Sequence, residues 1–201
     1  MRKIVFIDID GTVTDGTKRE EIVTKQGYVV GDYGSPNRKY PRGKYQFLMN
    51  FNHKDKFQFD ETLPHAKEFI QKLGQINTGT LEIFWLTARD VIYHEAIRLD
   101  LENRGLWFDG MRLICKPHAI FCNTLEYKVK ILSEIVSNSK PEYCLYVENE
   151  DRLRLGALEL RLDIIAVENC EEALKSLESH IQDTELAVSN THLRAHETRN
   201  Y

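Results

Sequence analysis

The sequence contains little that would hold it in a membrane or cross-link it. No apolar run approaches the roughly 20 residues that are needed to span a bilayer. The cysteines form no Cys-x-x-Cys pair, so we expect reduced thiols rather than a zinc site or a disulfide framework. These cysteines are Cys115, Cys122, Cys144 and Cys170. The first residues enter an apolar run directly, which predicts no signal peptide and a cytoplasmic protein.

An excess of charge of one sign is also absent. The net charge of −4 does not by itself indicate a polyanionic partner. Hydrophobic residues make up 42% of the chain and charged residues 29%, which is typical of a folded globular protein. A length of 201 residues suits one domain with room for an insertion.

Short apolar segments alternate with segments of helical periodicity. We expect strands over residues 3–9, 81–86, 111–115, 143–147 and 164–167. We expect helices over 63–73, 90–105, 124–136 and 151–160, and a last helix from residue 169. This alternation predicts an α/β fold of the Rossmann-like type, with a parallel five-stranded sheet covered by helices on both faces. Such sheets bind ligands beyond the carboxyl ends of their strands.

Two carboxylates follow the first predicted strand, in the run Asp8-Ile9-Asp10-Gly11-Thr12. Residues two apart in a strand point to the same side, so Asp8 and Asp10 converge at the strand end. Like charges this close repel each other unless a cation or a shared proton lies between them. The pattern therefore indicates a metal site.

The pattern Asp-x-Asp-Gly-Thr resembles the first motif of the haloacid dehalogenase (HAD) superfamily, most of whose members are phosphohydrolases. The resemblance implies that Asp8 is the nucleophile and forms an aspartyl phosphate. It implies that Asp10 protonates the leaving oxygen and then activates water. Gly11 would allow a tight exit from the strand beside the phosphate, and Thr12 would join it in substrate binding.

Two further strand ends match the later motifs of this superfamily. Thr87 stands where a Ser or Thr hydroxyl and the next backbone N–H groups, beginning with Ala88, bind a phosphoryl oxygen. Arg89 stands where many members place an arginine that suits a phosphate. Lys128 matches the lysine that stabilises the transferring phosphoryl group, with Lys130 as the alternative.

The fourth motif supplies acids for Mg²⁺, the cofactor that the resemblance implies. Glu150 and Asp151, followed by Arg152, align with the Asp-Asp-Arg of several relatives. Glu148 is the alternative, because it follows the apolar strand more directly. Asp8, the backbone carbonyl of Asp10 and one of these acids would be enough, since Mg²⁺ takes its other oxygen ligands from water and phosphate.

The segment of about residues 18–58 lies where this superfamily often inserts a small cap. It carries nine Lys or Arg and four acids, a net charge of +5 in an acidic chain, together with seven aromatic residues. Basic charge with interleaved rings suits single-stranded nucleic acid or a nucleotide. The alternative is a solvated cap whose rings pack on the main domain.

The layout also resembles the phosphatase half of polynucleotide kinase-phosphatases and the HAD domains of Swiss Army Knife RNA-repair proteins. The residues that carry this likeness are Leu86-Thr87-Ala88-Arg89, Lys116-Pro117, Asn123-Thr124 and Glu150-Asp151-Arg152. No G-x-x-x-x-G-K-[ST] sequence occurs, so the kinase half is absent. The likeness implies a nucleic-acid 3′-phosphate end or a nucleotide as the phosphorylated substrate. A small-metabolite phosphatase and a catalytically silent binding module are the alternatives.

Residues 188–198, V-S-N-T-H-L-R-A-H-E-T, closely resemble the translation of a transposase-type sequencing adapter with Asn190 in place of Tyr. We expect a single domain over residues 1–186 and a disordered, adapter-derived tail over 187–201. Removal of the residues after Leu186 should leave activity and melting temperature unchanged.

Overall fold

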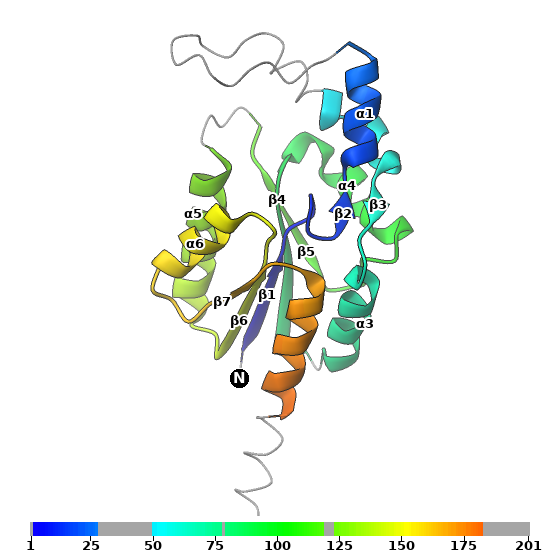
Figure 1. The fold of residues 1–201 in the computed structure, drawn as a ribbon. Coiled ribbons are helices and arrows are strands. Elements are labelled where there is room, and N and C mark those ends of the chain that lie inside the picture. Colours follow the sequence, from blue (N-terminus) through cyan, green and yellow to red (C-terminus); the bar gives the residue numbers. More distant parts are fainter. Residues whose placement is uncertain (1, 28–49, 78, 119–122, 183–201) are drawn as a thin grey trace, which may run out of the picture.

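The protein is an α/β structure built on a five-stranded parallel sheet (Figure 1). The computed structural model describes residues 2–27, 50–77, 79–118 and 123–182. The strand order is β5-β4-β1-β6-β7. The strands are β1 (Lys3–Ile7), β4 (Leu81–Asp90), β5 (Arg112–Lys116), β6 (Tyr143–Val147) and β7 (Ile165–Val167). This arrangement confirms the predicted fold class.

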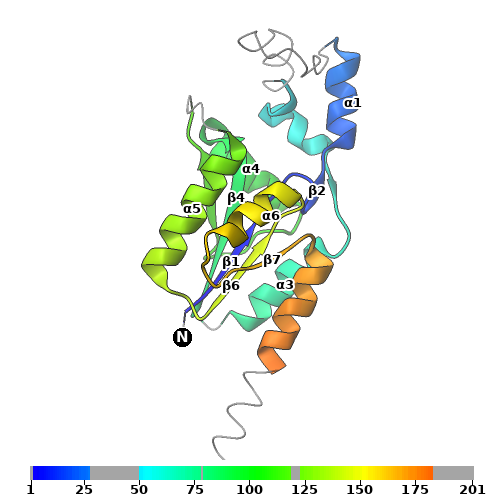
Figure 2. The same ribbon diagram turned by 60° about the vertical axis from the view of Figure 1, so that its left-hand side comes forward.

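Helices cover both faces of the sheet, as predicted (Figure 2). One face carries α3 (Ala66–Ile76), α4 (His94–Asn103) and a last helix over residues 170–182. The other face carries α5 (Thr124–Ser139) and α6 (Asp151–Glu159). No helix in the described part of the chain is long and apolar enough to cross a membrane.

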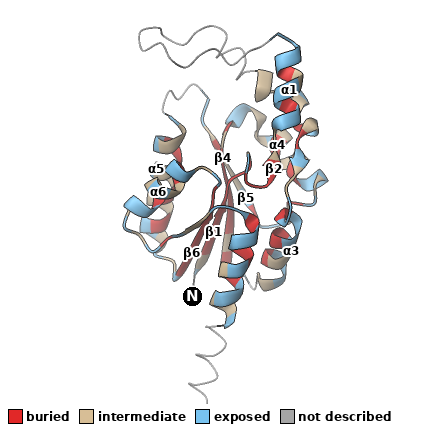
Figure 3. Ribbon diagram, in the orientation of Figure 1, coloured by how far each residue is buried: buried red, intermediate tan, exposed pale blue. Residues whose placement is uncertain are grey.

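Alternation along β1 divides the core into two layers. The strands β1, β4 and β6 are buried along most of their length (Figure 3). Val5 and Ile7 face the side of α3 and α4, whereas Ile4 and Phe6 face the side of α5 and α6. All four side chains have no exposed surface. A strand buried on both faces reads as a continuous apolar run, which is why this segment was recognisable in the sequence.

The central position of β1 brings three strand ends together. Its Ile7 pairs with Trp85 of β4 on one side and with Val147 of β6 on the other. The Asp8 backbone N–H donates to the Val147 carbonyl over 3.0 Å, so this alignment continues one residue beyond the strand. The residues that follow β1, β4 and β6 therefore meet at one edge of the sheet, where the chain reverses its strand order.

The insertion begins and ends at a small antiparallel pair, β2 (Thr14–Asp15) and β3 (Glu61–Thr62). Beyond that pair, α1 (Thr17–Lys25) and the 3-10 helix η1 (Lys54–Phe59) lie above the carboxyl ends of the sheet strands (Figure 1). The predicted cap spans about residues 18–58, and its central part, residues 28–49, lies outside the described residues. Cys122 and the whole of the predicted adapter-derived tail, residues 187–201, also lie outside the described residues.

Several element boundaries differ from the predicted ones for local reasons. Asn123, rather than Thr124, caps α5 and forms a reciprocal capping box with Glu126. Asp90 caps the short 3-10 turn η2 (Val91–Tyr93), and α4 begins only after that turn. The helix predicted from residue 63 begins at Ala66, because His65 before it has a positive φ of 61°.

Candidate active site

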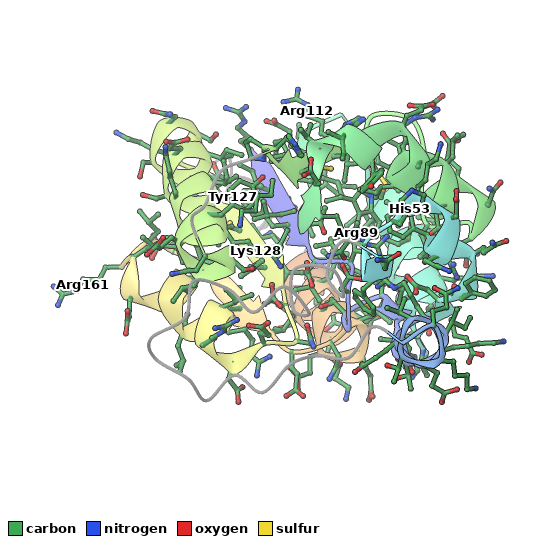
Figure 4. The ribbon with its side chains drawn as sticks, turned by 90° about the horizontal axis from the view of Figure 1, so that it is seen from above. His53, Arg89, Arg112, Tyr127, Lys128 and Arg161 are labelled. Carbon is green, nitrogen blue, oxygen red and sulfur yellow. The ribbon has the colours of Figure 1, made fainter. Side chains whose placement is uncertain are left out.

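Asp8 lies at the carboxyl end of the central strand and is 4% exposed. Its Oδ1 accepts a hydrogen bond from Lys128 Nζ over 2.5 Å, and its Oδ2 lies 3.4 Å from the Thr12 hydroxyl. The structure thus places the predicted nucleophile in direct contact with the predicted lysine of α5. Figure 4 shows the site from above, with Lys128 and Arg89 on opposite sides of the end of β1.

Lys128 bridges two carboxylates. Its Nζ also donates to Glu148 Oε2 over 2.7 Å, and the lysine side chain is 3% exposed. Lys130, the alternative, is 73% exposed and pairs with Glu134 on the helix surface. Only Lys128 of the two therefore contacts Asp8. Tyr146, which the sequence analysis missed, donates its hydroxyl to Glu148 over 2.7 Å.

One ammonium group shared by two carboxylates leaves this cluster with an excess of negative charge. Burial, together with the Glu148 and Asp10 carboxylates, raises the pKa of Asp8 to about 7, although Lys128 opposes the shift. Burial alone would lower the pKa of Lys128, but Asp8 and Glu148 outweigh it and raise that pKa. A further cation near Asp8 would offset the excess charge.

Asp10 is held by two arginines. Arg89 donates to both carboxylate oxygens, over 2.9 Å from Nε and 2.7 Å from Nη2. Arg19 Nη2 adds a bond of 2.5 Å to Oδ1. Although burial opposes it, this pairing holds the pKa of Asp10 well below its usual range. The ion pairs favour the ionised form of Asp10, which is the form that acts as a base.

A second carboxylate completes this arginine cluster. Asp60, at the end of η1, lies 3.0 Å from both Arg19 Nε and Arg89 Nη2, and neither of its partners is appreciably exposed. The guanidinium of Arg89 lies 4.2 Å from the ring centre of Phe57. Arg89 was predicted to contact phosphate, and in this structure it links the insertion to Asp10.

Thr87 and Ala88 lie where β4 becomes irregular beside β5. The Thr87 side chain has no exposed surface, and its hydroxyl oxygen accepts a bond of 3.2 Å from the Arg89 backbone N–H. Among the described residues the Thr87 hydroxyl donates to no acceptor, so its hydrogen could bind a phosphoryl oxygen. Ala88 is half-buried at the same strand end.

Gly11 leaves space for an amide that the sequence analysis did not consider. It has a positive φ of 80°, and a Cβ at this position would overlap the Asn149 side chain. One end of the Asn149 amide lies 3.2 Å from the Asp10 carbonyl oxygen and from Glu148 Oε1, and 3.3 Å from the Thr12 hydroxyl. If the Asn149 amide nitrogen lies at that end, it donates hydrogen bonds to these three oxygens. If the amide oxygen lies there instead, four oxygen atoms face one another.

The acids that were predicted to bind metal after β6 behave differently. Glu150 pairs with Arg152, and Asp151, which is 86% exposed, pairs with Arg154. Neither carboxylate contacts Asp8 in the described part of the chain. Glu148, the alternative, lies inside the cluster and contacts Lys128.

A magnesium ion at this edge would rely on mixed oxygen ligands. Within the described ranges, no three side chains of the His, Cys, Asp or Glu types gather as a metal-binding group. The oxygens that fit Mg²⁺ are those of the Asp8 carboxylate, the Asp10 carbonyl and the Asn149 amide, with Glu148 Oε1 beside them. This donor set agrees with the hard-oxygen preference of Mg²⁺ and differs from the predicted pair Glu150 and Asp151.

The missed residues left weak signals in the sequence. Arg19 lies one turn before Val23, and both face the interior of the protein. The spacing of Arg19 from the apolar Val23 was therefore the signal in the sequence that Arg19 faces the interior. Asn149 lies among three acids, Glu148, Glu150 and Asp151. Its amide side chain also offers an oxygen, but the acids are the more obvious metal ligands in the sequence.

Comparison with known proteins supports the fold. No family model matches the sequence, and no curated protein matches it. Among solved structures, a haloacid dehalogenase-like hydrolase from Streptococcus pneumoniae is 13% identical with a TM-score of 0.55, covering 82% of this chain and 84% of its own. The HAD domain of the effector protein Lem4 from Legionella pneumophila is 15% identical with a TM-score of 0.51, covering 88% and 93%.

A further similar structure is a chain of the Pnkp1/Rnl/Hen1 RNA repair complex. It is 14% identical with a TM-score of 0.50, and the match covers 84% of this chain and 43% of that one. At sequence identities of 13–15%, the similarity to these structures shows a shared fold alone. The protein described here has a haloacid dehalogenase-like fold, with its candidate site at the carboxyl end of the central strand.

Proposed function

We propose that this protein is a Mg²⁺-dependent phosphomonoesterase that acts through an aspartyl phosphate on Asp8. The observation that carries the proposal is the buried contact of Asp8 with Lys128 at the end of the central strand. A carboxylate at that position meets an incoming phosphate, and the adjacent ammonium group stabilises the negative charge of the transferring phosphoryl group. Bound Mg²⁺ would supply further charge stabilisation there.

The reaction has two steps. In the first, an Asp8 carboxylate oxygen bonds to phosphorus while the bond from phosphorus to the leaving oxygen breaks, and Asp10 gives that oxygen a proton. In the second, ionised Asp10 takes a proton from water, and the hydroxide oxygen displaces Asp8 from phosphorus. The two arginines on Asp10 favour the ionised form that the second step uses. The first step requires those contacts to loosen when substrate phosphate competes for the guanidinium groups.

Nucleic-acid 3′-phosphate ends or nucleotides are the substrates we favour. The insertion, over about residues 18–58, has a net charge of +5 in the sequence, which suits a polyanion. The fold likeness to a chain of an RNA repair complex agrees with this choice. Arg19 and Phe57 do not add to such a surface, because both are buried beside Asp60 and Arg89.

Phosphate release with Mg²⁺ tests the proposal. The panel contains p-nitrophenyl phosphate, nucleoside 3′- and 5′-monophosphates and a 3′-phosphorylated oligonucleotide, and an Asp8→Asn variant is measured in parallel. We expect release that disappears in Asp8→Asn and is fastest with the oligonucleotide. Release only from small esters would favour a metabolite phosphatase. Release that persists in Asp8→Asn would refute the covalent mechanism, and no release at all would favour a silent binding module.

A further inference from the structure

Arg19 is the least expected member of the candidate site. It belongs to α1, at the start of the insertion, and its side chain has no exposed surface. Its guanidinium lies 4.0 Å from the ring centre of Phe51 and 5.7 Å from that of Phe57. A Cβ at Gly16 would lie only 3.0 Å from Arg19 Nη2. The group is therefore enclosed by two rings and a glycine, and its orientation is restricted.

The hydrogen bonds of Arg19 are unusual for an arginine that only anchors a fold. Within the described residues its single well-formed hydrogen bond goes from Nη2 to Asp10 Oδ1. Nε lies 3.0 Å from Asp60 but without hydrogen-bond geometry, and Nη1 has no partner there. Buried donors are usually satisfied. Arg19 leaves two of its nitrogens unsatisfied and uses the third on the candidate acid–base residue.

Arg104 provides the contrast within the same structure. It donates to the backbone carbonyls of Asp60 and Phe57 over 2.8 Å and 2.7 Å, and to the Asp100 carboxylate over 2.9 Å. These bonds fix the same end of the insertion that Asp60 occupies. None of them reaches Asp10. Arg104 therefore anchors the insertion without a contact to Asp10, whereas Arg19 bonds to Asp10 itself.

Asp10 is partly exposed, at 37%, and its carboxylate could rotate without support. Arg89, at the end of β4, donates hydrogen bonds to both carboxylate oxygens of Asp10, and Arg19, in α1 of the insertion, donates one to Oδ1. Together these contacts set the plane of the carboxylate. Proton transfer depends steeply on such placement, because a displacement of about 1 Å can reduce a rate about 100-fold.

We propose that Arg19 is a positioning residue that orients ionised Asp10 for the proton transfer from water in the second step and makes this orientation depend on the insertion. The inference rests on the proposed phosphatase function and adds a residue from outside the four strand-end motifs. It means that α1 contributes a residue to the catalytic arrangement.

The test compares Arg19→Lys and Arg19→Met with the matched control Arg104→Met. Steady-state hydrolysis of p-nitrophenyl phosphate with Mg²⁺ gives kcat and KM, and thermal unfolding gives Tm. Arg19→Lys keeps a cation beside Asp60, so it guards against a variant that merely fails to fold. We expect both Arg19 variants to lose about 10- to 100-fold in kcat with KM changed less than about threefold. We expect Arg104→Met to lower Tm while keeping kcat within about threefold.

Three results separate the possibilities. If Arg104→Met loses as much kcat as Arg19→Met, anchoring of the insertion explains the effect and the positioning role is wrong. If Arg19→Lys and Arg19→Met both keep the wild-type kcat, the role is also wrong. If the wild type and Asp8→Asn release phosphate equally, the proposed function itself fails, which is a distinct outcome from failure of the positioning role.

Discussion

Replacement of Lys128 by methionine should destabilise the protein, because it removes the cation that pairs with the buried carboxylates of Asp8 and Glu148. Lys128 is the only cation that pairs with the carboxylates of Asp8 and Glu148 among the described residues, and these two residues are 4% and 1% exposed. Without the ammonium group, two acids remain buried with no positive partner. Loss of one partner from a buried ion pair typically costs about 3–5 kcal/mol.

Urea unfolding followed by tryptophan fluorescence would measure this loss, because Trp85 lies at the centre of the sheet with no exposed surface. For a chain of this size, a loss of 3–5 kcal/mol corresponds to a fall in Tm of roughly 6–20 °C. The loss should be smaller at pH 5 than at pH 8, since the stranded carboxylates can then bind protons. The double variant Lys128→Met/Glu148→Gln should recover part of the stability, because it removes one of the two acids.

Lys130→Met is the matched control. Its side chain is 73% exposed, and its surface pair with Glu134 should contribute no more than about 1 kcal/mol. A Lys128→Met protein whose stability lies within about 1 kcal/mol of this control would refute the reasoning, because the cluster would then tolerate two buried carboxylates without a cation.

Three further predictions follow from the same structure. The pKa of Asp8 in the folded protein, about 7, exceeds its ordinary value of 3.8. The stabilising contribution of Asp8 is therefore complete below pH 3.8 and disappears as pH rises through 7, so Tm without Mg²⁺ should fall over this range. Added Mg²⁺ should reduce the fall in Tm near pH 7. An equal fall in Tm with Mg²⁺ would argue against a metal at Asp8. Burial raises the pKa of Cys115, Cys144 and Cys170 to about 12, so these thiols should react with Ellman's reagent at pH 8 only after denaturation, as mass spectrometry of the labelled sites would show. Gly11→Ala should lower stability by about 1–2 kcal/mol in urea unfolding, because its positive φ strains alanine, and an unchanged stability would contradict the close approach at this turn.

The strand-end motifs were predictable because each is local in the chain. Asp8 and Thr87 stand at the ends of recognisable apolar segments, and parallel strand order brings such ends to one edge. Lys128 lies early in the helix that was predicted from its apolar spacing over residues 124–136. Contacts across long separations could not be predicted in this way. Asp60 lies 41 residues from Arg19, and no periodic pattern links two charged residues so far apart. The choice among the acids after β6 stayed open in the sequence for a similar reason, since only the backbone path decides that Glu148 turns inward and Asp151 outward.

The small pair of β2 and β3 has a consequence for how this protein can vary. Thr14 pairs with Thr62 and Asp15 with Glu61, so the chain leaves the sheet domain and returns to it at adjacent points. A segment whose ends are already joined can change in length at little entropic expense, since doubling a flexible loop costs only about 0.6 kcal/mol. The chain between β2 and β3 can therefore be replaced by a segment of different length or chemistry while the sheet and its strand ends stay the same.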